Sequence, residues 1–149
     1  MPTIEESVVI SAPAGKIFSF MADATNAPVF DSSCIRCEPE GDGVPAVGSR
    51  WKGATKVLGR EFDWVSEYTE LETDRLIAIK SVESKLPFQI RTELTPDGDD
   101  VRVNYRLEAD SGLGGVFGRL ADPLVVKAQT RTVKANLASL KDLMESDAV

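Results

Sequence analysis

The chain has 149 residues, a length typical of one domain with its own hydrophobic core. Its composition is 42% hydrophobic and 28% charged, and its net charge of −7 argues against nucleic acid or an anionic membrane as main partner, because both favour basic surfaces. The sequence contains no histidine, which excludes Ser-His-Asp and Cys-His catalysis and removes the commonest metal ligand and general base.

The sequence shows no sign of membrane insertion or export. No apolar run approaches the roughly 18 residues that cross a bilayer, and the first seven residues resemble neither the basic nor the apolar part of a signal peptide. We therefore expect one domain over residues 1–149, located in the cytoplasm, with no stable membrane insertion. Whether it is a monomer or a homodimer is left open.

The chain begins with a predicted strand and two short predicted helices. Residues Thr3 to Ser11 alternate between apolar and polar positions, which is typical of a strand. Ser11 or Ala12 is then expected to cap a helix that has Pro13 in its first turn. A second helical piece is expected around Thr25 to Phe30.

Six more strands are predicted in succession, bounded by Gly, Pro and Asp turn signals. Their expected ranges are Ser33–Pro39, Ser49–Leu58, Arg60–Leu71, Arg75–Ser84, Phe88–Thr95 and Val101–Ala109. Strands joined by near-continuous hairpins favour an antiparallel sheet with one face in water.

The last quarter of the chain, about Gly112 to Ser146, opens with four glycines and then takes a helical apolar period. Its first half, Val116 to Ala128, is apolar nearly all round, so we expect it to be covered on more than one side. Pro123 is expected to bend this helix or begin its main body, because proline lacks the N–H of a helical hydrogen bond. The simplest architecture is one long helix laid across a curved antiparallel sheet.

Several short motifs fit one known arrangement of strand, two short helices, six strands and long helix. They are Ile10-Ser-Ala-Pro13, Gly48-Ser-Arg-Trp51, Gly59-Arg-Glu-Phe62 and Leu137-Ala-Ser-Leu140, with Ile17-Phe18, Trp64 and Tyr68. On these motifs the chain resembles the START-like, or birch-pollen-allergen-like, helix-grip superfamily (SRPBCC), and within it bacterial polyketide cyclase/dehydrase and lipid-transport proteins. The resemblance covers essentially the whole chain, but its motifs are structural and not catalytic.

The resemblance implies an α+β helix-grip fold with about seven strands and an internal cavity between the sheet and the C-terminal helix. That cavity would hold a hydrophobic small molecule, and we expect its volume to exceed roughly 300 Å³.

One face of a predicted strand combines aromatic bulk with a few polar groups, as pocket walls do. It carries Phe62, Trp64, Ser66 and Tyr68, and plain core is the alternative interpretation. Tyr105 is a lone phenol on another apolar face, able either to orient a ligand or to bond to the backbone. The full set of predicted ligand-binding residues is Trp51, Thr55, Phe62, Trp64, Ser66, Tyr68, Phe88, Ile90, Tyr105, Phe117, Leu120 and Leu124.

Two other motifs are expected to be structural. Cys34 and Cys37 form a C-x-x-C inside a predicted strand, where a spacing of three puts side chains on opposite faces. Zinc would need two further ligands, so we expect two ordinary free thiols and no metal. The run Gly112 to Gly118 does not match a dinucleotide or phosphate loop, and no cofactor is expected. Asp31 either caps a loop or enters the cavity mouth.

The sequence therefore favours a protein that binds a hydrophobic small molecule, lipid-like or polyketide-like. A polyketide cyclase/aromatase or dehydratase is the alternative, with Tyr, Arg or water as acid or base and no catalytic residue assigned. A second alternative is a protein-interaction or assembly module, which predicts a large exposed apolar patch.

Overall fold

The structure, a computed structural model, describes residues 3–57, 59–84, 87–109 and 123–146, with the backbone alone for Val57 and residues 123–125. Its elements in chain order are β1 (Thr3–Ile10), α1 (Ala14–Ala22), the 3₁₀ turn η1 (Ala24–Asn26), α2 (Ala27–Phe30), β2 (Cys34–Pro39), β3 (Arg50–Val57), β4 (Arg60–Glu72), β5 (Leu76–Ser84), β6 (Phe88–Asp97), β7 (Asp100–Ala109) and α4 (Pro123–Glu145).

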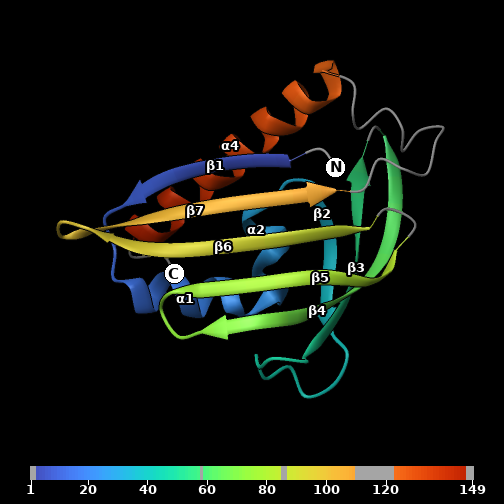
Figure 1. Ribbon diagram of the computed structural model, residues 1–149, viewed down its shortest axis with the longest axis horizontal. Coiled ribbons are helices and arrows are strands. Elements are labelled where there is room, and N and C mark those ends of the chain that lie inside the picture. Colours follow the sequence, from blue (N-terminus) through green and yellow to red (C-terminus); the bar gives the residue numbers. More distant parts are fainter. Residues whose placement is uncertain (1–2, 58, 85–86, 110–122, 147–149) are drawn as a thin grey trace.

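The described strands form one antiparallel sheet of seven strands in the order β1-β7-β6-β5-β4-β3-β2 (Figure 1). Strands β2 to β6 each pair with the next strand along the chain. Strand β1 instead pairs with β7, so β1 and β2 are the two edges and the short helices connect them. The predicted helix-grip fold class is confirmed.

Local bulges help to bend the sheet. The register shifts within the β2–β3 pair and twice within the β4–β5 pair. A bulge adds one unpaired residue, which bends the strand and increases its twist. The sheet therefore curls, and α4 lies on the side toward which it curls (Figure 1).

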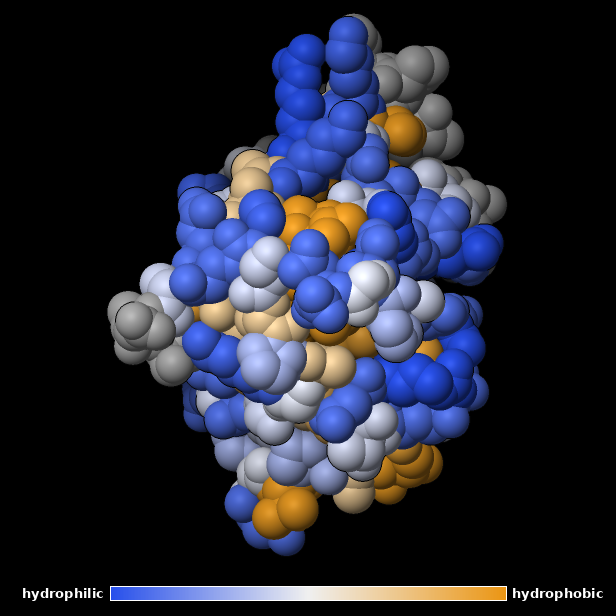
Figure 2. Space-filling model, turned by 90° about the vertical axis from the view of Figure 1, so that its left-hand side faces the viewer, coloured by the Kyte–Doolittle hydropathy of each residue, from blue (hydrophilic) through white to orange (hydrophobic). Residues whose placement is uncertain are grey.

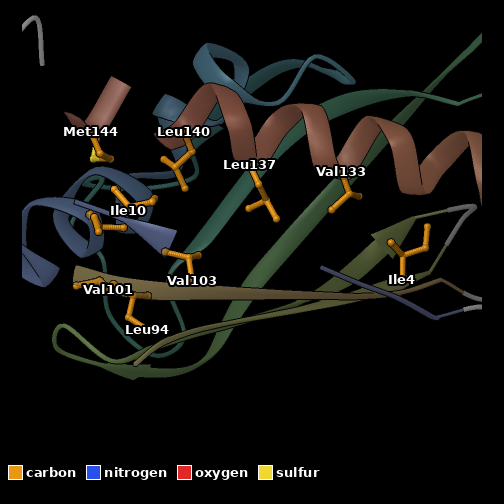
Figure 3. Packing of buried hydrophobic residues seen from close by; sticks show 10 residues of the cluster. Ile4, Ile10, Leu94, Val101, Val103, Val133, Leu137, Leu140 and Met144 are labelled. Carbon is orange, nitrogen blue, oxygen red and sulfur yellow. The ribbon is translucent and has the colours of Figure 1, made fainter. Parts of the chain in front are cut away.

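Helix α4 closes the curled sheet through one apolar stripe. Val133, Leu137, Leu140 and Met144 are all at most 6% exposed and recur at helical spacing. They point toward buried residues of β1, β6 and β7, among them Val103 (Figure 3). This end of the helix is thus packed as a conventional core.

Polar contacts fix the C-terminal end of α4 to the turn after β1. Lys141 Nζ donates to the carbonyl of Val9 at 2.9 Å and to Glu145 at 2.6 Å. Glu145 also accepts from the Ser11 N–H at 2.7 Å, and these two hydrogen bonds lower the pKa of the Glu145 carboxyl. The contacts fix where the helix ends relative to the sheet.

Two expectations about helix starts have different outcomes. Pro13 is the N-cap residue of α1 and does not lie in its first turn, because its ψ of 142° is extended. The described part of α4 starts at Pro123, and the apolar segment expected before it lies outside the described residues, so the role of Pro123 in bending or beginning the helix stays a prediction.

The molecular surface is mostly hydrophilic on the face shown in Figure 2, where hydrophobic groups form separate spots. Among the described residues the large apolar side chains that are exposed are Val29, Ile35, Val44 and Val47. Within the described part of the chain, no helix combines the length and apolar character needed to cross a membrane.

We predict that Leu140→Ala lowers the free energy of unfolding by about 2–5 kcal/mol, because it removes a fully buried side chain and leaves a cavity. Urea unfolding followed by circular dichroism measures the change. Ser139→Ala, at the exposed neighbouring position, is the control and should change stability by no more than about 0.5 kcal/mol. Equal effects of the two substitutions would contradict the packing described for α4.

Candidate ligand-binding site

A cavity lies between the inner face of the sheet, the short helices and the first half of the described α4. Its volume is about 210 Å³, and a second lobe of about 120 Å³ adjoins it. The two lobes share Ala24, Ala27, Asp31, Ile79, Ile90, Tyr105, Val133 and Asn136. The main lobe alone is smaller than the roughly 300 Å³ expected from the sequence.

Aromatic side chains form one wall of the main lobe. Trp64 and Phe88 meet edge to face with ring centroids 5.9 Å apart, and Phe62 lies on the same face of β4. Trp64 Nε1 donates to Thr55 Oγ1 at 2.8 Å, which fixes the indole across β3. The polar atom of the indole is thereby satisfied within the wall.

Gly53 allows Trp64 to take this position. A Cβ at Gly53 would lie 2.8 Å from the Trp64 ring and 2.2 Å from the carbonyl oxygen of Arg36. Real Cβ atoms do not approach other atoms so closely. The absence of a side chain at this one position of β3 therefore lets the indole lie flat against the strand.

Trp51 and Tyr68 contribute mainly to the core. Trp51 is 1% exposed, does not border the cavity, and packs on Tyr68 with centroids 5.7 Å apart. Tyr68 borders only the smaller lobe and donates to the carbonyl of Ala22 at 2.5 Å. Burial, with Cys37 and Asp23 nearby, raises the pKa of the Tyr68 phenol above its usual range.

The two cysteines lie on the same face, so the expectation of opposite faces is wrong. Cys34 pairs with Thr55 and Cys37 with Gly53, two residues apart on β3, because the bulge inserts Ile35 as an extra residue. Both thiols are free, buried, and border the main lobe. Burial is the main cause that raises the pKa of each thiol to about 12.

A polar network joins the α2–β2 turn to the middle of α4. Asp31 Oδ1 accepts from Ser33 N at 2.9 Å, Ser33 Oγ at 2.7 Å and Asn136 Nδ2 at 2.9 Å. Asn136 Oδ1 in turn accepts from Ser32 N at 3.1 Å. Asp31 therefore both caps its loop and borders the cavity, where the sequence had left the two roles as alternatives.

Tyr105 borders both lobes from β7. Among the described residues its hydroxyl has no hydrogen-bond partner. Burial, followed by the nearby Asp31 carboxylate and Cys34 thiol, raises the pKa of this phenol well above its usual range. The group thus stays protonated at neutral pH and can donate a hydrogen bond.

Two buried polar atoms lack a partner in the described part of the chain: Ser66 Oγ and Trp51 Nε1. Ser66 and Trp51 are directly opposed in the β3–β4 pair, and Ser66 also borders the main lobe. A buried hydroxyl without a partner costs free energy, so this position suits a ligand that supplies one.

The structure places the predicted ligand-binding residues in three groups. Those that border the main lobe are Thr55, Phe62, Trp64, Ser66, Phe88, Ile90 and Tyr105. Trp51 is core, and Tyr68 reaches the smaller lobe alone. Phe117 and Leu120 lie outside the described residues, as does the side chain of Leu124.

Of the α4 residues, the sequence predicted only Leu124 at the cavity, and the residues of α4 after it were missed. Val126, Gln129, Thr132 and Asn136 all border the main lobe. Asn136 is 9% exposed and lies beside the stripe of Val133 and Leu137. A polar residue within the buried face of an amphipathic helix was the available signal.

The fold and this cavity define a helix-grip protein of the START-like superfamily. The chain belongs to the family described as polyketide cyclase/dehydrase and lipid transport, which matches residues 1–145. A search of curated proteins found no match.

Solved structures share this fold at low sequence identity. The crystal structure of TTHA0849 from Thermus thermophilus is 18% identical, with a TM-score of 0.82 over 99% of this chain and 100% of that one. A START superfamily protein from Mycobacterium smegmatis is 17% identical, with a TM-score of 0.72 over 96% and 97%. The Zhui aromatase/cyclase from Streptomyces sp. R1128 is 16% identical, with a TM-score of 0.71 over 96% and 93%.

We predict that Gly53→Ala lowers the free energy of unfolding by about 1–3 kcal/mol, because the added methyl group overlaps Trp64 and the Arg36 carbonyl. Urea unfolding measures the change. Gly15→Ala in α1 is the matched control: its Cβ would lie 3.6 Å from the nearest atom, an ordinary contact, so stability should stay constant or rise by up to about 1 kcal/mol. A neutral Gly53→Ala would contradict the described position of the indole.

We predict that both thiols react slowly in the folded protein, because a pKa of about 12 leaves little thiolate at pH 8. Ellman's reagent at pH 8 should react at least roughly a hundredfold more slowly with the folded than with the unfolded chain. In the folded protein, the rate of this thiol reaction should still rise between pH 8 and 10, because the thiolate fraction increases with pH below the pKa of each thiol. The unfolded, unreduced protein should yield two thiols per chain, and a count of zero would contradict the free state of the cysteines.

Proposed function

We propose that this protein binds a small hydrophobic molecule, lipid-like or polyketide-like, in the cavity between the sheet and α4. The supporting observation is the composition of the wall. Apolar surface dominates it, and polar side chains from several elements, among them Asp31, Ser66, Tyr105 and Gln129, interrupt that surface. Ligand sites typically combine apolar surface for affinity with a small number of polar groups for orientation.

The size of the main lobe limits the ligand. An apolar protein cavity of roughly 150 Å³ holds benzene, so a lobe of about 210 Å³ accommodates a substituted ring or a small bicyclic compound. Burial of such a ring contributes about 25 cal/mol for each Å² removed from water. A longer ligand would also need the adjoining lobe, where Tyr68 and Ile77 lie.

We predict that Leu107→Trp, which places an indole in the main lobe from β7, abolishes binding of naphthalene while the protein stays folded. Fluorescence displacement or calorimetry measures the affinity, and urea unfolding measures the stability. Arg106→Trp on the exposed face of the same strand is the matched control and should leave binding unchanged. Unchanged naphthalene binding in Leu107→Trp, or no binding by the unmodified protein, would contradict the proposal.

Native mass spectrometry of the protein purified from its own host identifies a natural ligand. The measurement requires no assumption about chemistry, because a molecule held in an internal cavity co-purifies with the chain. The same ligand should be absent from Leu107→Trp purified in parallel.

An enzymatic function, as a polyketide cyclase/aromatase or dehydratase, is the second candidate. One observation favours it: the Asp31 carboxylate and the Tyr105 phenol border the same cavity and lie close enough to interact electrostatically. Such a pair supplies a proton acceptor and a proton donor. If Tyr105 is a general acid, Tyr105→Phe should lower turnover by roughly 10² to 10⁴ with little loss of affinity. If the protein only binds its ligand, the same substitution should lower the affinity by only about 1 kcal/mol.

A further inference from the structure

The described part of the cavity lining carries little charge. Among the described residues that line the two lobes, Asp31 is the one charged side chain, and the others include no lysine or arginine. A ligand carboxylate in this part of the cavity would therefore meet a like charge and no compensating cation.

Hydrogen bonds hold the Asp31 carboxylate through only one of its two oxygens. Its Oδ1 accepts three hydrogen bonds, two from Ser33 and one from Asn136. Among the described residues its Oδ2 accepts none. The turn and α4 both bond to Oδ1, which leaves Oδ2 as the acceptor that Asp31, a residue bordering both lobes, can offer to a ligand.

Two hydroxyl groups on the same wall also lack partners in the described part of the chain. Ser66 is completely buried, and its Oγ makes no hydrogen bond. Tyr105 Oη is likewise unpaired, and burial, followed by the Asp31 carboxylate, raises the pKa of this phenol, so it stays protonated at neutral pH. The lining that the two lobes share therefore offers a carboxylate acceptor and a phenolic donor, with a further hydroxyl on β4.

We propose that Asp31 and Tyr105 select a neutral ligand that presents a hydroxyl group, and that the Asp31 charge excludes carboxylates such as free fatty acids. The ligand hydroxyl donates to Asp31 Oδ2 and accepts from Tyr105 Oη. This inference rests on the proposed binding function and assigns its specificity.

The physical basis is the cost of burying charge. Two carboxylates close together in a mostly apolar cavity repel each other, and the described lining residues supply no cation to either. An ammonium group would pair with Asp31 but would lose much of its hydration on entering the cavity. A hydroxyl loses little hydration and makes one hydrogen bond to a charged acceptor, the stronger kind.

The test compares probes that share one ring system. Naphthalene, 2-naphthol, 2-naphthamide, 2-naphthoate and 2-naphthylmethylamine are titrated into the unmodified protein at pH 7, and their dissociation constants are measured by calorimetry. We expect 2-naphthol to bind roughly tenfold more tightly than naphthalene, and 2-naphthoate at least tenfold more weakly than the nearly isosteric 2-naphthamide.

Substitutions assign these preferences to residues. Asp31→Asn retains an acceptor oxygen for the turn and should improve 2-naphthoate binding by roughly tenfold or more, while the preference for 2-naphthol over naphthalene falls. Tyr105→Phe should reduce that preference, measured as the ratio of the naphthalene to the 2-naphthol dissociation constant. Asp63→Asn on the exposed face of β4 is the control for loss of one negative charge and should change nothing.

The outcomes separate this inference from the binding proposal. Naphthalene binding without discrimination between naphthoate and naphthamide overturns the charge selection and leaves the binding proposal intact. Tighter binding of 2-naphthylmethylamine than of 2-naphthol overturns selection for a neutral ligand. Binding of none of the probes overturns both proposals. If Asp31→Asn does not fold, the comparison of naphthoate with naphthamide in the unmodified protein decides the question.

Discussion

The structure depends on how α4 packs against the curled sheet. One helix does not fill all of the space that this sheet encloses. Toward its C-terminus, Leu140 and Met144 fill the space above β1 and β7 completely. Nearer its start, Val126 and Thr132 border the cavity. The same helix thus provides a close-packed core along one half and a cavity wall along the other.

This division explains why the fold tolerates an internal cavity. Empty apolar volume is destabilising, roughly in proportion to its size, and the packed half of α4 must compensate for it. The polar contacts of Lys141 and Glu145 with the turn after β1 hold the helix at its packed end. A bound ligand would add contacts on the cavity side and raise stability through its affinity for the folded state.

The polar part of the cavity depends on contacts between distant segments. Asn136 lies 105 positions from Asp31, yet their hydrogen bond holds the carboxylate at the wall. Among the described lining residues, Asp31 Oδ2, Tyr105 Oη and Ser66 Oγ have no hydrogen-bond partner.

The sequence by itself determined the order and type of the elements, because alternation and helical period are local properties that each segment expresses alone. It also identified the inward face of β4 and Tyr105, since a strand has only two faces. The tertiary structure decided the rest. A bulge at Ile35 turned Cys34 and Cys37 to one face, packing made Trp51 core and not wall, and the fold brought Asp31 to Asn136. Bulges and long-range hydrogen bonds depend on the partner strand or helix, which no local pattern specifies.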